Sequence, residues 1–215
     1  MESEMDSIRT NKTWDLVQLP KDRRALPCKW VYRLKETSDS TTPRYKARLV
    51  AKGFRQEYGV DFDEIFSPVV KMTTLRFMLG VVAAENLELI QLDVKTAFLH
   101  GDLKEEIYME QPKGFVVSGQ EHLVCRLRKS LYGLKQAPRQ WYKKFDDFIR
   151  SVGFSKSDED HCLFTKTAQD GSPVFLIIYV DDMLRLTYTH SDSRAKTGRG
   201  LVCKRTITHH IFSKS

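Results

Sequence analysis

The sequence predicts a domain of the α+β class, because strands and helices mix without the regular alternation of a parallel sheet. Residues 29–35 and 44–51 alternate between apolar and polar side chains, as the two strands of a hairpin do. Apolar residues recur at helical spacing over 73–85 and again after Pro138. The apolar run 174–180 predicts a buried strand.

The N-terminal part of the chain predicts a helix followed by the hairpin. Met5 and Ile8 are three residues apart and indicate a helix over 5–12, and residues 14–19 are expected to be its end, since Pro20 stops a helix. A turn is expected over 38–43, and a loop or short helix over 53–60. Pro68 interrupts the chain before the helix 73–85, whose apolar stripe is expected to pack in the core: Leu75, Met78, Leu79 and Val82.

The second half of the chain predicts further strands and one amphipathic helix. The apolar face of this helix carries Trp141, Phe145, Phe148 and Ile149, and Gly153 lies past its end. Strands are expected at 89–92, 123–127, 162–165 and 174–180, a short element at 104–109, and turns at 111–114 and 169–171.

Composition excludes several classes of protein. The 215 residues are 41% apolar and 29% charged, as in ordinary globular domains. No apolar run approaches the roughly 18 residues of a membrane span, and the first residues lack the apolar region of a secretory signal, so none is expected. The four cysteines form no Cys-x-x-Cys pair, which argues against a zinc site and against a disulfide framework. We therefore expect an intracellular protein in a reducing compartment, without a membrane.

Basic residues gather in two places. Residues 185–215 carry seven Lys or Arg and one acid, so most of the net charge of +7 belongs to this tail. Residues 21–55 carry eleven Lys or Arg and three acids, interleaved with Trp30, Tyr32 and other aromatic residues. Such a pattern suits a phosphate backbone or a triphosphate. A solvated strand face is the alternative.

Carboxylates follow two of the predicted strands. Asp181 and Asp182 come directly after the run 174–180, and Asp93 follows 89–92. Carboxylates at the end of a buried strand are costly unless a cation compensates them, and oxygen ligands suit magnesium. If the strands are neighbours, Asp93 and Asp181 could share metal ions. Alternatively, the Asp pair belongs to a solvated turn.

Three histidines invite a metal or acid–base interpretation, but they lack the spacing of metal ligands. We expect His100, His122 and His161 to be ordinary surface or packing residues.

Six sequence blocks occur in order: RYKARLVAKG (44–53), FSPVVK (66–71), LDVKTAFLHG (92–101), IYMEQP (107–112), SLYGLKQAP (130–138) and YVDD (179–182). Together they closely resemble the reverse transcriptase of copia-type LTR retrotransposons, from about residue 5 to Leu184. The resemblance implies the fingers and palm of a right-hand polymerase, with an antiparallel palm sheet flanked by helices and with the thumb absent.

This resemblance also implies a division of the chain. Residues 1–88 would form a fingers-like region with the basic hairpin at about 29–52, and 89–184 a palm-like region with the catalytic carboxylates. The remainder, 185–215, is expected to be a divergent and poorly ordered basic tail, although Leu184, Leu186 and Tyr188 alternate and could continue a strand briefly. We interpret this tail as a frameshifted or mis-spliced end, and the N-terminus as clipped.

Site residues follow from the matching blocks. The resemblance implies that Asp93 and Asp181 ligate two Mg²⁺ ions, or Mn²⁺, with Asp182 as a supporting carboxylate. It places Phe98 against the sugar 2′ position of the incoming nucleotide, where the ring would reject a ribonucleotide. A plain core aromatic is the alternative for Phe98.

Further residues of these blocks would bind nucleotide or nucleic acid. Lys46 and Arg48 would lie over the triphosphate, and they are the better pair because alternation puts them on one strand face. The remaining residues are Tyr132, Gly133 and Gln136 for the nucleotide, and Lys52 and Lys135 for nucleic acid.

The function expected from the resemblance is RNA-directed DNA polymerisation, in which deoxynucleoside triphosphates extend a primer on an RNA or DNA template. Thumb and RNase H regions would be missing parts of the parent polyprotein, and the family implies a cytoplasmic particle. One alternative is a non-catalytic remnant with at most weak nucleic-acid binding. Another is a different two-metal phosphotransferase or nuclease, against which Phe98 and the block 132–138 argue.

Overall fold

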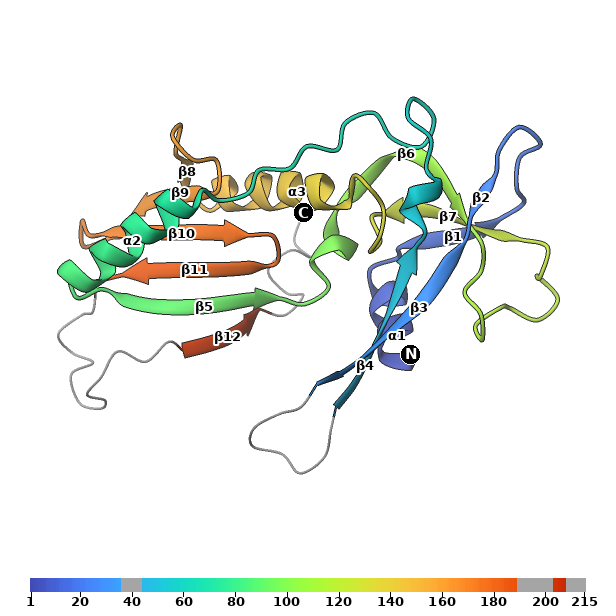
Figure 1. The fold of residues 1–215 in the computed structure, drawn as a ribbon, viewed down its shortest axis with the longest axis horizontal. Helices are drawn as coiled ribbons and strands as arrows, with labels where there is room; N and C mark the ends of the chain where they lie inside the picture. Colours follow the sequence, from blue (N-terminus) through green and yellow to red (C-terminus); the bar gives the residue numbers. More distant parts are fainter. Residues whose placement is uncertain (36–43, 189–202, 208–215) are drawn as a thin grey trace. The chain divides into compact units, whose positions relative to one another are not determined.

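A computed structural model describes residues 1–35, 44–188 and 203–207, and Figure 1 shows its ribbon. The chain divides into two compact units. Unit 1 comprises Met1–Phe66 and Phe98–Lys144, and unit 2 comprises Ser67–Ala97 and Phe145–Ser215. Each unit is therefore built from two separate stretches of sequence, whereas the sequence predicted the consecutive regions 1–88, 89–184 and 185–215. That functional division stays a prediction.

Unit 1 is mostly built of strands. Its described strands form the sheet β1-β7-β6-β2 and the hairpin β3-β4. The elements are α1 (Glu2–Thr10), β1 (Trp14–Val17), β2 (Ala25–Leu26), β3 (Cys28–Lys35), β4 (Arg44–Ala51), η1 (Gly53–Arg55), β6 (Asp102–Met109), β7 (Val124–Lys129) and the first half of α3 (Ala137–Ser151), with η2 (Ala97–His100) at the boundary.

The structure confirms the hairpin that the alternating sequence predicted. Strands β3 and β4 pair antiparallel from Cys28↔Ala51 to Lys35↔Arg44. Residues 38–43, where the turn was expected, lie outside the described residues.

The prediction that residues 14–19 end the first helix is wrong. Helix α1 stops at Thr10, and Lys12 takes a left-handed conformation with φ of 50°, which redirects the chain. Residues 14–17 then pair antiparallel with β7, from Trp14↔Leu127 to Val17↔Val124. Pairing with a strand more than a hundred residues away decides the conformation here, and the local pattern does not contain that information.

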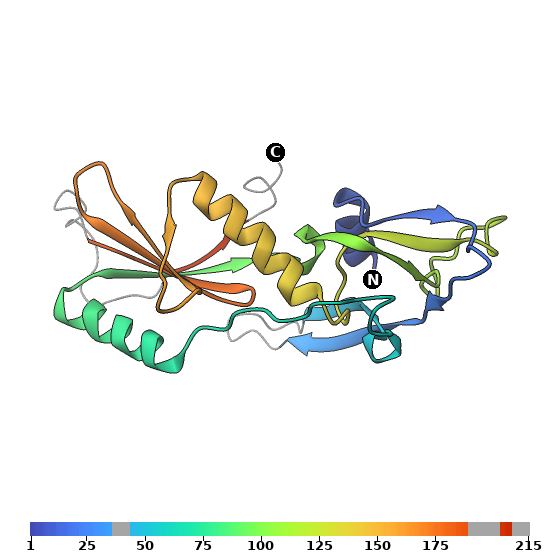
Figure 2. The same cartoon turned by 90° about the horizontal axis from the view of Figure 1, so that it is seen from above.

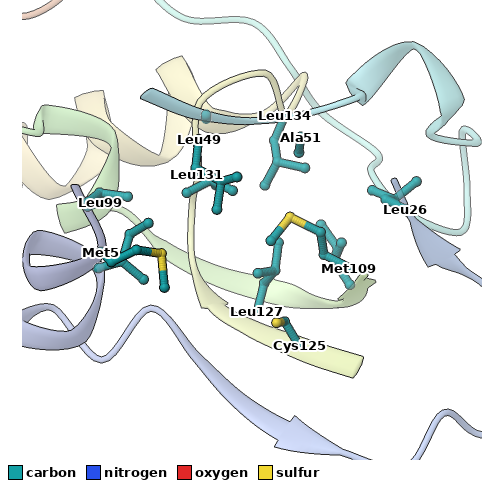
Figure 3. Packing of buried hydrophobic residues seen from close by; sticks show 13 residues of the cluster. Met5, Leu26, Leu49, Ala51, Leu99, Met109, Cys125, Leu127, Leu131 and Leu134 are labelled. Atoms are coloured by element: carbon teal, nitrogen blue, oxygen red, sulfur yellow. The ribbon is translucent and has the colours of Figure 1, made fainter. Parts of the chain in front are cut away.

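A dense apolar core holds unit 1 together (Figure 3). Leu49 and Ala51 enter this core from β4, and Leu131 and Leu134 enter it from the loop that precedes α3. Burying a leucine side chain contributes about 1.5–3 kcal/mol. The hairpin and the loop are therefore anchored in the same core, which fixes their exposed side chains relative to each other.

Unit 2 is a sheet with helices on both faces. Its described strands have the order β12-β5-β11-β10-β9-β8, antiparallel except for the β12–β5 pair. Figure 2 shows α2 and the end of α3 on opposite faces of this sheet. The elements are α2 (Met72–Ala84), β5 (Glu88–Val94), the second half of α3, β8 (Ser155–Lys156), β9 (Leu163–Thr167), β10 (Pro173–Tyr179), β11 (Asp182–Thr187) and β12 (Cys203–Ile207).

Several expectations for unit 2 are confirmed. β10 and β11 form a hairpin, and β11 continues to Thr187, as the alternation after Leu184 predicted. The structure adds β12, which the sequence did not predict and which pairs with β5. Residues 189–202 and 208–215 lie outside the described residues. Most of the tail that was expected to be poorly ordered falls in these two stretches.

The apolar stripe of α2 packs less completely than predicted. Met78 is buried, Leu75 and Val82 are half-buried, and Leu79 is 43% exposed. Leu79 is therefore a surface residue, and the prediction was wrong for this position. None of the helices in the described residues is long and apolar enough to cross a membrane.

Candidate functional site

The predicted carboxylates lie at one edge of the sheet in unit 2, although β11 separates β5 from β10, so the two strands expected to be neighbours are not adjacent. In the β5–β11 ladder Asp182 is the direct partner of Asp93. Directly opposed residues share a sheet face, with Cβ atoms about 4.5–5.5 Å apart, and both side chains are exposed. Asp181 lies in the adjoining turn, where its backbone oxygen accepts a hydrogen bond from Val94 N at 3.2 Å. All three carboxylates therefore lie at one end of two adjacent strands, with Asp182 rather than Asp181 directly opposite Asp93.

The turn that carries Asp181 is strained. Tyr179 pairs with Asp182, so that Val180 and Asp181 alone form the loop. Val180 has a φ of 58°, a conformation that β-branched residues rarely adopt. Two-residue hairpin loops usually place Gly, Asn or Asp at such positions. Strain of this kind costs about 1–3 kcal/mol and is concentrated at functional sites.

The donor chemistry of this edge fits a hard divalent cation. Two like charges directly opposite each other destabilise a sheet, and carboxylate oxygens are the ligands that Mg²⁺ prefers. One neighbouring contact is neutral, since Gln91 Nε2 donates to Asp182 Oδ1 at 3.3 Å. Within the described residues, however, no three His, Cys, Asp or Glu side chains are grouped closely enough to hold a metal ion. The edge thus offers an opposed carboxylate pair with a third carboxylate beside it.

In unit 1, one basic and two aromatic side chains are in contact, and we call them the aromatic cluster: Arg48, Phe98 and Tyr132. The guanidinium carbon of Arg48 lies 4.9 Å from the centre of the Tyr132 ring. The rings of Phe98 and Tyr132 meet edge to face, with centroids 5.1 Å apart. Phe98 is half-buried against the core as well, so it is both a packing residue and part of this surface. The cluster presents a cation and flat aromatic rings, which suit a nucleotide.

A glycine allows the loop of Tyr132 to approach β4. Gly133 has a φ of 91°, and a Cβ added there would lie 2.1 Å from the backbone oxygen of Ala51. Next to it, Ala51 N donates to Tyr132 O at 2.8 Å. No other residue would permit this contact. Gly133 therefore allows the backbone of the loop to lie directly against β4, and this places Tyr132 beside Arg48.

Gln136 lies beneath the same loop and is completely buried. Its Oε1 accepts a hydrogen bond from Gln56 Nε2 at 2.9 Å, and its Nε2 donates to Asp61 O at 2.8 Å. Gln56 Oε1 in turn accepts from Lys135 N at 2.8 Å. Because both ends of the Gln136 amide are occupied, the side chain holds the loop in place. The nucleotide-binding role of Gln136 stays a prediction, and its side chain would act through the position of this loop.

The remaining predicted cations lie at the surface of unit 1. Lys46 is exposed, opposite Arg33 in the hairpin register, and opposed like charges favour a bound anion. Lys52 is half-buried. Lys135 is exposed, and its Nζ lies 4.4 Å from the centre of the Phe62 ring.

Glu4 of α1 is a buried carboxylate near Arg48 and Lys46 that the sequence interpretation missed. It is 8% exposed, and burial raises the pKa of its carboxyl group, although a backbone hydrogen bond at Leu49 and the charges of Arg48 and Lys46 lower it. A signal was present, because Glu4 and the buried Ile8 are four residues apart and share a helix face.

Three histidines and three cysteines of the described residues take no part in these two sites. His100 is buried, with its ring 6.1 Å from that of Trp141, as expected of a packing residue, and His122 and His161 are exposed. Cys28, Cys125 and Cys162 are free thiols. Burial raises the pKa of Cys125 and of Cys162 to about 12, so that both remain protonated.

Comparisons with known proteins show the family of the chain. Residues 11–195 match the family "Reverse transcriptase (RNA-dependent DNA polymerase)". The chain is 59% identical over 184 residues to the retrovirus-related Pol polyprotein from transposon TNT 1-94 of Nicotiana tabacum, and 45% identical over 185 residues to that from transposon RE1 of Arabidopsis thaliana. It is 31% identical over 186 residues to the transposon Ty1-LR2 Gag-Pol polyprotein of Saccharomyces cerevisiae.

These matches cover 86% of this chain in the two plant polyproteins and 84% in the yeast one. The chain spans only 14%, 13% and 10% of the respective relatives. Because the family match extends over most of the sequence, the chain belongs to the reverse transcriptase (RNA-dependent DNA polymerase) family, among the Pol polyproteins of copia-type transposons.

Proposed function

We propose that the chain is the RNA-directed DNA polymerase domain of a copia-type element and adds deoxynucleotides to a primer. The observation that carries this proposal is the register that sets Asp182 directly opposite Asp93, with Asp181 in the adjoining strained turn. In this proposal the hairpin β3–β4 serves as the fingers, and the sheet that contains β5, β10 and β11 serves as the palm.

The carboxylates of unit 2 would hold two divalent ions, Mg²⁺ or Mn²⁺. Asp93 and Asp181 are the proposed ligands, and Asp182 adds negative charge opposite Asp93. Bound there, the ions would lower the pKa of the primer 3′-hydroxyl and stabilise charge on the leaving pyrophosphate. Asp93 and Asp182 are exposed and Asp181 is half-buried, which leaves carboxylate oxygens accessible to metal and substrate.

Unit 1 supplies groups that suit a nucleotide. Arg48 and Lys46 would bind the triphosphate, since both project cationic groups from β4. Tyr132 offers a flat ring beside Arg48, and Phe98 would lie against the sugar, where its bulk excludes a 2′-hydroxyl. Lys52 and Lys135 would bind the phosphate backbone.

Other parts of this proposal concern partners. The substrates are a primer on an RNA or DNA template and deoxynucleoside triphosphates. Thumb and RNase H regions of a parent polyprotein would hold the primer–template duplex and remove template RNA.

Primer extension on poly-rA/oligo-dT with Mg²⁺ tests the proposal. We expect wild type to extend the primer, and Asp93→Asn and Asp181→Asn to lose about a thousandfold or more in rate, since metal ligation is worth several kcal/mol. Asp147→Asn is the matched control, because Asp147 is an exposed aspartate of α3. Arg48→Met should raise KM for the nucleotide. Extension that persists in Asp93→Asn would refute the proposed roles.

A second candidate is a non-catalytic remnant that binds nucleic acid weakly. It is favoured by the absence of a three-ligand metal group in the described residues, whereas the basic surface of β4 is intact. Folded wild type would then fail to extend a primer, yet bind it with an affinity that falls as salt rises. Asp93→Asn would leave that affinity unchanged, and Lys46→Met would weaken it.

A further inference from the structure

Unit 2 contains a cavity of about 530 Å³ between helix α3 and one face of the sheet. Figure 2 shows α3 lying over this face. A cavity of this size is in the range that binds small molecules. Its wall is mainly apolar and includes Leu92, Phe145, Phe148, Ile149, Leu176 and Met183.

The cavity lies on the other face of the sheet from the carboxylates. Leu92 and Met183 are direct partners in the β5–β11 ladder and both line the cavity. Their neighbours Asp93 and Asp182 must point to the opposite face, since successive residues of a strand alternate. A ligand in the cavity would therefore be separate from the metal chemistry proposed above.

Arg185 is the unusual residue in this wall. On β11 it lies between Ile90 of β5 and Leu176 of β10, so its neighbours on the same face are apolar. Its Nε is buried and has no hydrogen-bond partner, and no described carboxylate forms an ion pair with its guanidinium. A partly desolvated cation without a partner destabilises a fold. An anion in the cavity would remove that cost.

The other charged residue in the wall of the cavity is also a cation. Lys166 is an exposed second cation at the cavity, where its Nζ donates to Val152 O at 2.6 Å. The other polar lining residues, Thr167 and Gln169, are neutral, and none of the described lining residues is acidic. The cavity is thus apolar in its body and positive in its wall.

We propose that this cavity binds a small amphipathic anion, an aliphatic carboxylate whose head pairs with Arg185. The apolar body of the ligand packs against Phe145, Phe148 and Met183. The arginine fork binds a carboxylate through two parallel hydrogen bonds, and each buried methylene of the tail adds about 0.8 kcal/mol. This assignment does not depend on polymerase activity.

Isothermal titration with dodecanoate and with dodecanol, both kept monomeric, tests the assignment. Wild type should bind dodecanoate at least about tenfold more tightly than dodecanol, because a hydrogen bond to a charged group is worth about 1.5–3 kcal/mol. In Arg185→Met this preference should disappear, through weaker binding of dodecanoate with dodecanol unchanged. The melting temperature of this variant should not fall, which shows that it is folded.

Arg76→Met is the matched control, since Arg76 is an exposed arginine of α2 that does not line the cavity. It should retain the preference for the carboxylate. Equal binding of the two probes by wild type, no binding of dodecanoate, or the same weakening of both probes in Arg185→Met would each overturn the proposal.

Discussion

The two units hold their functional side chains in opposite ways. In unit 1 the aromatic cluster is fixed by ring contacts, a cation–π contact and a loop that is bonded to β4, all over a dense core. In unit 2 the carboxylates of Asp93 and Asp182 are exposed and directly opposed, next to a strained turn, and the other face of their sheet borders a cavity. Unit 1 is thus organised before it binds anything, whereas unit 2 holds charge that a bound cation would stabilise.

The largest effect is expected from opening the core of unit 1. Leu131→Ala should lower the free energy of unfolding by about 3 kcal/mol, since Leu131 is completely buried and the truncation leaves a cavity. Urea unfolding measures the loss. Amide hydrogen exchange should become faster first in β4 and β7, because both strands contribute residues to this core.

Leu79→Ala is the matched control, because Leu79 is 43% exposed on α2. This change should cost about 0.5 kcal/mol or less. If the two leucine variants were equally destabilised, the contrast between a dense core and a loosely packed helix would be wrong.

Local patterns predicted much of the fold. The alternation over 29–35 and 44–51 was enough to predict β3 and β4. In such a strand every second residue is apolar, so the pattern is visible in the local sequence. The strand β1 was missed, because residues 14–17 are strand only through pairing with β7. Strand β12 was missed for the same reason, since its partner β5 lies about a hundred residues earlier.

In the candidate site, too, features that depend on contacts distant in sequence could not be predicted. Asp93, Asp181 and Asp182 could be singled out because they come at the ends of apolar runs. The ladder then places Asp182, and not the predicted Asp181, opposite Asp93. The burial of Gln136 could not be predicted, since its partner Gln56 is 80 residues away in sequence. The place of Gly133 against Ala51 likewise depends on a long-range contact. Sequence pattern indicates which residues are chemically unusual, and long-range packing decides which of them reach the surface.

A smaller effect is expected from Asp160, a buried and hydrogen-bonded carboxylate of unit 2. Its Oδ2 accepts from Lys71 N and its Oδ1 from Cys162 N, both at 2.9 Å, which ties the start of α2 to β9. Asp160→Asn should cost about 2 kcal/mol, because it replaces a charged acceptor in buried hydrogen bonds. Urea unfolding at neutral pH measures this loss.

The contribution of Asp160 should depend on pH. Burial tends to raise the pKa of its carboxyl group, but hydrogen bonds from Cys162 and Lys71 outweigh burial and hold the pKa below the ordinary value of 3.8. A lowered pKa in the folded state adds stability above the unfolded pKa, and this stability is lost as the pH falls through the folded value. Stability of Asp160→Asn should therefore fall less steeply in acid than that of wild type. Asp158→Asn, a change at an exposed neighbour, should keep the wild-type slope.

The smallest effect is expected at the strained turn of unit 2. Val180→Gly removes a β-branched side chain from a left-handed conformation, which should recover about 1–3 kcal/mol of strain. Glycine also lowers stability by about 0.5–1 kcal/mol, because it increases the conformational freedom of the unfolded chain. The difference of the two effects is a net stabilisation of about 1 kcal/mol. Val180→Ala keeps a Cβ and should gain less. If Val180→Gly gained stability in urea but lost primer extension, the strain would be a cost that the carboxylate edge requires for function. If the variant lost stability instead, the turn would not be strained, and unit 2 would be as well organised as unit 1.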